Sequence, residues 1–187
     1  TVVFNRSALL FAGEDGVAAV SIIMYLQFLC IGIYFGFSMG LSAPLGYAYG
    51  DRNFSVCRVL EKYAYRFFAI APIILYGCTY LLAPIGVRFF ASPGSTVFDM
   101  AVSGMRLYGL GFLFSGINIF AAIRMMTYGK GYISGMITFL RSFALLLLFL
   151  TVLPRFLELN GIWLAVPAAE ILTLIVALWT LRKKTVA

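Results

Sequence analysis

The sequence has 187 residues, of which 63% are hydrophobic and only 11% are charged, and its mean hydropathy is +0.99. So little polar surface cannot coat a water-soluble globule of this length, and the chain is expected to be an all-α integral membrane protein surrounded by lipid. The net charge of +7 is most simply explained by basic loops facing the cytoplasm, so nucleic acid is not an expected partner. There is no histidine, and the three cysteines show no CxxC spacing, so neither a metal site nor another cofactor is predicted.

Five segments are apolar enough to cross a bilayer, which takes about 20 helical residues. They are predicted at residues 17–46, 67–87, 102–123, 136–154 and 161–181. Residues 1–12 are too short to cross and are interpreted as the end of a truncated sixth helix. The chain starts with TVVFNRSALL, which indicates no signal peptide and suggests a fragment of a longer protein.

The connections between these segments alternate in charge, which predicts their orientation. Those after the first, third and fifth spans carry nine of the fourteen basic residues, and the intervening ones are acidic or balanced. Because positively charged loops remain in the cytoplasm, the C-terminus is predicted to be cytoplasmic. The nine are Arg52, Arg58, Lys62, Arg66, Arg124, Lys130, Arg182, Lys183 and Lys184.

The first span carries glycines at every fourth position, Gly32, Gly36 and Gly40, followed by Pro44. Small residues at this spacing let a neighbouring helix approach closely, so one interpretation is static helix packing. The other is a bendable helix of the kind found in transporters. At about 30 residues, the span is longer than a bilayer requires and predicts a tilt or a kink.

Polar side chains within the spans are the candidate functional residues, because they are costly at membrane depth. Glu170, near the middle of the last span, is either a proton or cation site or a hydrogen-bonded carboxyl that locks two helices together. Ser115 and Asn118 share one helix face, and they either bond to another helix or contact a solute. Tyr25 and Gln27 in the first span raise the same two possibilities.

Two arginines and many aromatic rings are predicted to lie toward the membrane surfaces. Arg141 is about five residues into the fourth span and is expected to extend to the cytoplasmic surface, while Arg106 is expected to reach the outer one. An interfacial belt of rings is predicted at Tyr47, Tyr49, Phe54, Tyr63, Tyr65, Phe89, Phe90, Tyr128, Tyr132 and Trp179. The acids are scattered and no catalytic motif is present, so the chain is not expected to be an enzyme.

Several stretches, in order along the whole chain, resemble the second half of bacterial multidrug and toxic compound extrusion (MATE) transporters. They are NRSALLFAGEDGVAAVSIIMYLQ, GFSMGLSAPLGYAYGDRNFSVCRVLEKYAYR, FLFSGINIFAAIRMMTYGKG and PRFLELNGIWLAVPAAEIL. The most specific pieces are the Pro-x-x-Gly-Tyr-x-Tyr-Gly corner with its basic continuation and the Gly-Ile-Trp-x-Ala-x-Pro start of the last helix.

This resemblance implies one six-helix lobe of a twelve-helix, two-lobe antiporter in the inner cell membrane, with the N-terminal six-helix lobe missing. Such proteins export cationic, often aromatic, compounds in exchange for protons (H+) or sodium ions (Na+) by alternating access. Many members carry a carboxylate in the tenth helix, at a position that falls near Ser115 or Gly116 here, where this sequence has no acid. Ion coupling is therefore left to the missing lobe, to the truncated helix or to Glu170.

Two alternatives remain open at this stage. A flippase for lipid-linked sugars, from the same superfamily, would be favoured by long basic cavity surfaces, of which this chain shows few signs. A non-transporting membrane scaffold subunit is the other alternative, and the glycine-rich spans and the buried Glu170 argue mildly against it.

Overall fold

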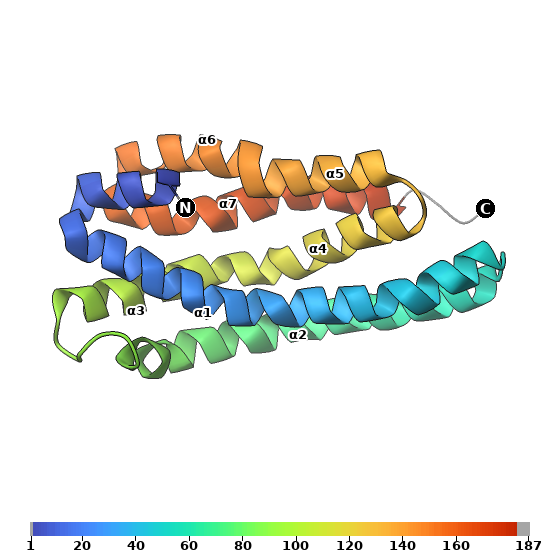
Figure 1. Ribbon diagram of the computed structural model, residues 1–187, viewed down its shortest axis with the longest axis horizontal. Helices are drawn as coiled ribbons and strands as arrows, with labels where there is room; N and C mark the ends of the chain where they lie inside the picture. Colours follow the sequence, from blue (N-terminus) through green and yellow to red (C-terminus); the bar gives the residue numbers. More distant parts are fainter. Residues whose placement is uncertain (1, 183–187) are drawn as a thin grey trace.

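The structure is a computed structural model that describes residues 2–182, so the predicted cytoplasmic Lys183 and Lys184 lie outside the described residues. Every element within that range is a helix, and the helices run lengthwise along one elongated bundle (Figure 1). They are α1 (Val2–Gly50), α2 (Phe54–Arg88), α3 (Thr96–Tyr108), η1 (Gly109–Gly111), α4 (Phe112–Thr127), α5 (Gly131–Phe139), η2 (Leu140–Ala144), α6 (Leu145–Val152) and α7 (Pro154–Arg182).

Five of these helical stretches are long and apolar enough to cross a membrane, which confirms the predicted fold class. The third span is the continuous run α3–η1–α4 and the fourth is α5–η2–α6. Each span is longer than the apolar segment that predicted it, because the helix continues into the polar flank at one end or at both, and only short turns remain between spans.

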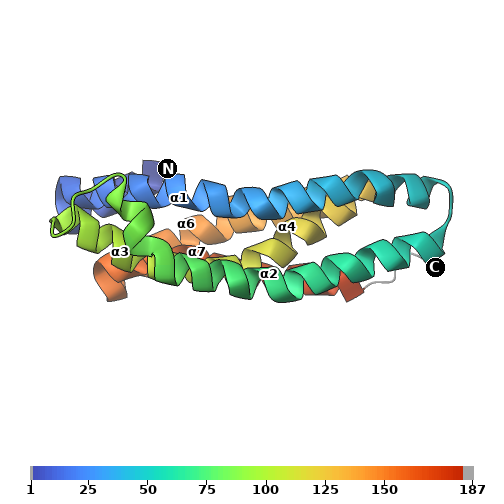
Figure 2. The same cartoon turned by 90° about the horizontal axis from the view of Figure 1, so that it is seen from below.

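The first helix reverses direction at Gly13, where φ is 61° and ψ is −151°. The residues before Gly13 fold back beside the rest of the bundle, and both views show the chain turning at that end (Figures 1 and 2). The reversal brings Ala8 against Gly16, where an added Cβ would lie 2.9 Å from the Ala8 carbonyl oxygen. Glycine at both positions therefore permits the segment before Gly13 to pack as a separate short helix.

The turn between α1 and α2 forms at the Tyr-Gly corner of the sequence. Gly50 ends α1, and the Asn53 side chain caps α2 by accepting a hydrogen bond from the Val56 backbone N–H at 3.3 Å. The two helices then run back along each other, with the Phe37 and Phe67 rings stacked at a centroid distance of 3.8 Å. The corner thus produces a long antiparallel helix pair.

The third span is the centre of the lobe. In its most apolar window 72% of residues are buried, compared with 11% for the fourth span, so α5–η2–α6 is the most peripheral. Glycines make close packing possible here: a Cβ added at Gly104 would meet the Trp163 ring at 2.8 Å, and one at Gly116 would meet Phe68 at the same distance. Close packing in the described residues therefore uses glycines of the central span.

The glycines predicted to mediate packing lie in α1 and not in the central span. A Cβ added at Gly32, Gly36 or Gly40 would find no atom within 4 Å among the described residues. The static-packing interpretation of this stripe is therefore wrong for the contacts within this lobe. Regular spacing defines a helix face, but it does not determine which face meets a neighbour.

A buried polar cluster joins α2 to α4 at the end of the bundle where the α1–α2 and α4–α5 turns lie (Figure 1). Arg124 forms an ion pair with Glu61, and the Tyr128 hydroxyl donates to the same carboxylate oxygen at 2.7 Å. Tyr49 packs on the Tyr128 ring at a centroid distance of 4.5 Å. Tyr128 is therefore a buried partner of Glu61, and its assignment to an exposed interfacial belt is wrong because the neighbouring acid draws its hydroxyl inward.

Candidate functional site

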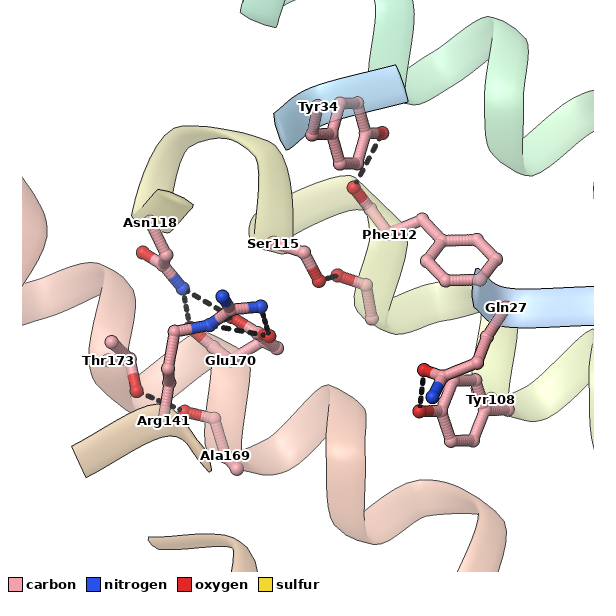
Figure 3. Close-up of polar contacts among 11 residues, drawn as sticks. Gln27, Tyr34, Tyr108, Phe112, Ser115, Asn118, Arg141, Ala169, Glu170 and Thr173 are labelled. Atoms are coloured by element: carbon pink, nitrogen blue, oxygen red, sulfur yellow. Dashed lines mark hydrogen bonds and ion pairs between the residues drawn. The ribbon is translucent and has the colours of Figure 1, made fainter. Parts of the chain in front are cut away.

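The candidate site is centred on Glu170, which lies near the middle of α7 and is only 4% exposed. Asn118 from α4 donates its amide N–H groups to the Glu170 carboxylate at 2.7 Å and to the Glu170 backbone carbonyl at 2.9 Å. Arg141 reaches the same carboxylate from the fourth span (Figure 3). Three different spans therefore converge on one acid.

Arg141 binds Glu170 through two of its nitrogens. Its Nη2 lies 2.6 Å from Oε1, and its Nε lies 3.1 Å from Oε1 and 3.3 Å from Oε2. The expectation that Arg141 extends to the cytoplasmic surface is therefore wrong. Its depth along the helix permitted that extension, but a buried carboxylate on α7 supplies a nearer and better partner.

Asn118 holds the carboxylate from its buried side. It is fully buried, and its Oδ1 has no hydrogen-bond partner among the described residues. Reversing the amide would place Oδ1 against the carboxylate and carbonyl oxygens of Glu170, so the observed orientation is the favourable one. Leaving a buried acceptor without a hydrogen bond costs about 1–3 kcal/mol. The two hydrogen bonds that Asn118 donates to Glu170 must therefore stabilise the fold by more than this cost.

A cavity of about 280 Å³ adjoins this cluster, which is slightly below the usual size range of small-molecule sites. Glu170 and Arg141 form part of its wall together with Ser115. Two aromatic rings at its edge, Phe28 and Phe35, are 76% and 43% exposed, so the cavity lies at the surface of the lobe. The cavity therefore combines apolar rings with a charged pair.

Two further polar contacts complete the lining. The Tyr108 hydroxyl donates to Gln27 Oε1, which joins α3 to α1, and the Ser115 hydroxyl donates to the Gly111 carbonyl at 2.7 Å (Figure 3). The Gln27 amide nitrogen lies 3.3 Å from the Met24 sulfur. The cavity wall thus presents polar groups that are already hydrogen-bonded, which suits orientation of a ligand better than strong attraction of one.

The structure brings together four of the five sequence-predicted site residues and leaves one apart. Glu170 and Ser115 line the cavity with Gln27, and Asn118 lies directly behind Glu170. Tyr25 is 66% exposed and stacks on Phe90 with a centroid distance of 6.0 Å. It lines a different, almost wholly apolar hollow of about 960 Å³ between α1 and the end of α2.

Sequence reasoning missed two residues of the site, Arg141 and Tyr108. The signal for Arg141 was present, since it is a charge inside an otherwise apolar span and such residues mark functional paths. Tyr108 carried no comparable signal, because one tyrosine among many in this chain is unremarkable until Gln27 is placed opposite it. Within residues 2–182, no group of three or more acidic, cysteine or histidine side chains is arranged to hold a metal ion.

The fold and the site together define a polytopic helical membrane protein with a charged pair beside a surface cavity. Comparison with known families is specific: residues 2–153 match the MatE family, and the chain belongs to that family. This membership confirms the resemblance found in the sequence and agrees with the expectation that the chain is not an enzyme. No curated protein sequence matches the chain.

Solved structures of similar fold agree with this family. An outward-facing multidrug resistance MATE family transporter of the MOP superfamily is 22% identical with a TM-score of 0.86, over 96% of this chain and 41% of its own. A MOP superfamily transporter from Pyrococcus furiosus is 21% identical with a TM-score of 0.86, over 96% and 41%. A mutant of the Vibrio cholerae MATE transporter VcmN is 20% identical with a TM-score of 0.85, over 97% and 42%.

These likenesses establish the fold. The chain spans about two fifths of the length of the proteins to which it is compared. That proportion is consistent with one lobe of a two-lobe protein.

Proposed function

We propose that the chain forms the C-terminal lobe of a secondary transporter that exports organic cations in exchange for protons or sodium ions. One observation carries this proposal: a buried carboxylate, Glu170, lies beside a cavity at the surface of the lobe. A carboxylate can bind a proton, a sodium ion or an organic cation, but each of these excludes the others by charge and space. Such mutual exclusion at one site is the simplest basis for exchange transport.

The cavity lining supports aromatic or apolar cations as the substrate class. The exposed rings of Phe28 and Phe35 offer π-faces, which attract a cation while burying its apolar surface. Gln27 and Ser115 add polar groups that would orient a bound molecule. Tyr25, in its separate apolar hollow, is proposed as a contact along the path and not as part of the central site.

An N-terminal six-helix lobe is the proposed partner that closes this cavity. Because the cavity lies at the surface of the described residues, a second six-helix lobe facing it would create a central chamber. Rocking of the two lobes would then expose that chamber alternately to each side of the membrane.

The proposed setting is the inner cell membrane, with the C-terminus in the cytoplasm. The α1–α2 and α4–α5 turns, which hold Arg52 and Lys130 and are flanked by Arg58 and Arg124, lie at the same end of the bundle as the end of α7 (Figure 1). Positive charge gathered at one end supports a cytoplasmic location for that end. The cavity supports a lipid-linked sugar flippase less well, because the arginine in its wall is paired with Glu170 and the described residues that line it include no second cation for phosphate.

The function is tested by efflux. The full-length protein containing this chain is expressed in a bacterium that lacks its own drug pumps, and accumulation of ethidium is followed by fluorescence. Reduced accumulation is expected with the wild-type protein, and unchanged accumulation would exclude drug export.

The role of Glu170 is tested in the same assay. Glu170→Gln, which keeps the shape of the side chain, should abolish efflux while the amount of protein in the membrane stays constant. The matched control is Glu14→Gln, an exposed acid near the Gly13 turn. Efflux that survives Glu170→Gln would reduce Glu170 to a structural carboxyl.

A further inference from the structure

The two partners of the Arg141–Glu170 pair are held very differently. Glu170 is fixed by Asn118 on its buried side, through both the carboxylate and the backbone carbonyl. Both residues border the cavity, and the Arg141 side chain is 12% exposed whereas that of Glu170 is 5% exposed. The carboxylate is therefore the more firmly held partner, and the guanidinium is the more exposed one at the cavity wall.

The backbone that carries Arg141 is also unusual. Residues Leu140–Ala144 form a π-helical turn inside the fourth span, between α5 and α6. Single π-turns of this kind are uncommon and occur frequently at functional sites, because the wider turn loosens the regular hydrogen-bond ladder. The fourth span is also the least buried of the five. Arg141 is thus attached to the most peripheral helix, at its least regular turn.

From this asymmetry we infer that Arg141 is a tethered cation that occupies Glu170 when the site is empty and is displaced by the transported cation. The inference rests on the proposed function, and it makes Arg141 a specificity-determining residue. A guanidinium binds a carboxylate through two parallel hydrogen bonds, so a ligand must do more than supply a positive charge. It must also bury apolar surface, and the exposed Phe28 and Phe35 rings at the cavity edge provide the place.

Among exported organic cations, this arrangement selects those with large apolar surfaces. A compact, strongly hydrated organic cation gains only the charge interaction that Arg141 already makes, and it loses its water shell. A cation with aromatic substituents adds ring contacts that Arg141 does not make. The tethered guanidinium therefore sets a minimum affinity for Glu170 that a ligand must exceed in order to bind. It also ensures that the buried carboxylate keeps a counter-ion between transport cycles.

Removal of the competitor gives a defined outcome. If Arg141 leaves the carboxylate accessible about one tenth of the time, the apparent affinity for a ligand is lowered about tenfold by that occupancy. Binding of tetraphenylphosphonium to the purified full-length protein should therefore be about tenfold tighter in Arg141→Gln than in the wild type. Arg141→Lys, which keeps the charge but loses the bidentate geometry, should give an intermediate tightening, and it provides the measurement if Arg141→Gln fails to fold.

A double-mutant cycle separates displacement from simple charge repulsion. In a Glu170→Gln background, Arg141→Gln should change the affinity for tetraphenylphosphonium less than about twofold. The reason is that no carboxylate remains for which Arg141 and the ligand could compete. An equal tightening in both backgrounds would mean general repulsion and would overturn the inference. Unchanged or weaker binding in both Arg141→Gln and Arg141→Lys would overturn it as well.

The failure of this inference is distinguishable from failure of the proposed function. Absence of tetraphenylphosphonium binding and of ethidium efflux in the wild type would refute cation export itself. Normal wild-type binding and efflux, with no tightening in the Arg141 variants, would refute only the tethered-cation role. Arg155→Gln is the matched control, because Arg155 is exposed near the start of α7, away from the cavity lining, and its loss should leave binding unchanged.

Discussion

Loss of Arg124 is expected to destabilise the protein strongly, although Arg124 lies outside the cavity lining. Arg124 is 3% exposed and Glu61 is 8% exposed, so Arg124→Gln leaves a buried acid that keeps, among its partners in residues 2–182, the Tyr128 hydroxyl but no cation. Removing one member of a buried ion pair costs about 3–5 kcal/mol. Because Tyr128 retains its charge-assisted hydrogen bond, we expect the lower end of that range, about 3 kcal/mol.

The assay is thermal unfolding of the purified full-length protein in detergent. For an unfolding unit of 150–250 residues, 1 kcal/mol corresponds to about 2–4 °C, so Arg124→Gln should lower the melting temperature by about 6–12 °C. The apolar double variant Glu61→Leu with Arg124→Met should be close to wild type, because no charge is left unpaired. A loss under about 2 °C in the single variant, or an equal loss in the double variant, would refute a buried ion pair at this position.

Two further predictions concern the same end of the bundle and the core. Burial, followed by the hydrogen bond to Glu61, raises the pKa of Tyr128 well above its usual value, so the folded state keeps a proton that the unfolded chain releases above about pH 10. Stability should therefore fall as pH rises above 10, and Tyr128→Phe should make that fall shallower in melting curves. Gly104→Ala should cost about 1–3 kcal/mol in thermal unfolding, because its Cβ would lie 2.8 Å from the buried Trp163 ring. Gly135→Ala, an exposed control on α5 with nothing within 4 Å, should be neutral or stabilising by up to about 1 kcal/mol.

The spans were predictable because hydrophobicity over about 20 residues is a local property. The same holds for the need of Glu170 for a partner, since an acid in an apolar helix requires one wherever it lies. The partner itself was not predictable, because Arg141 and Glu170 are on different helices and their meeting depends on how these are rotated against each other. Position along a helix gives depth in the membrane, and it suggested that Arg141 could reach the surface; it does not give the direction in which the side chain points.

The basic residues near the α1–α2 and α4–α5 turns also have partners that the sequence does not reveal. Arg124 was interpreted only as one of the basic residues that orient the protein, and that role does not exclude a second one. Its pairing with Glu61 requires α2 and α4 to be aligned along their lengths, which loop lengths and composition do not specify. Tyr128 was assigned to the interface for a similar reason, since a ring near the end of a span can face either lipid or a neighbouring acid.

The two buried ion pairs found among residues 2–182 have opposite surroundings, and that contrast is the reason for proposing only one of them for exchange. The Glu61–Arg124 pair lies between α2 and the central α4, is reinforced by Tyr128, and is absent from the lining of the cavity at Glu170. The Arg141–Glu170 pair has its acid fixed by Asn118 of the same α4 and its base on the peripheral fourth span beside that cavity. Breaking the first leaves a buried charge with no replacement. Breaking the second at the cavity would, as we propose, admit a replacement cation, because Asn118 of α4 holds the carboxylate in place while the guanidinium moves aside.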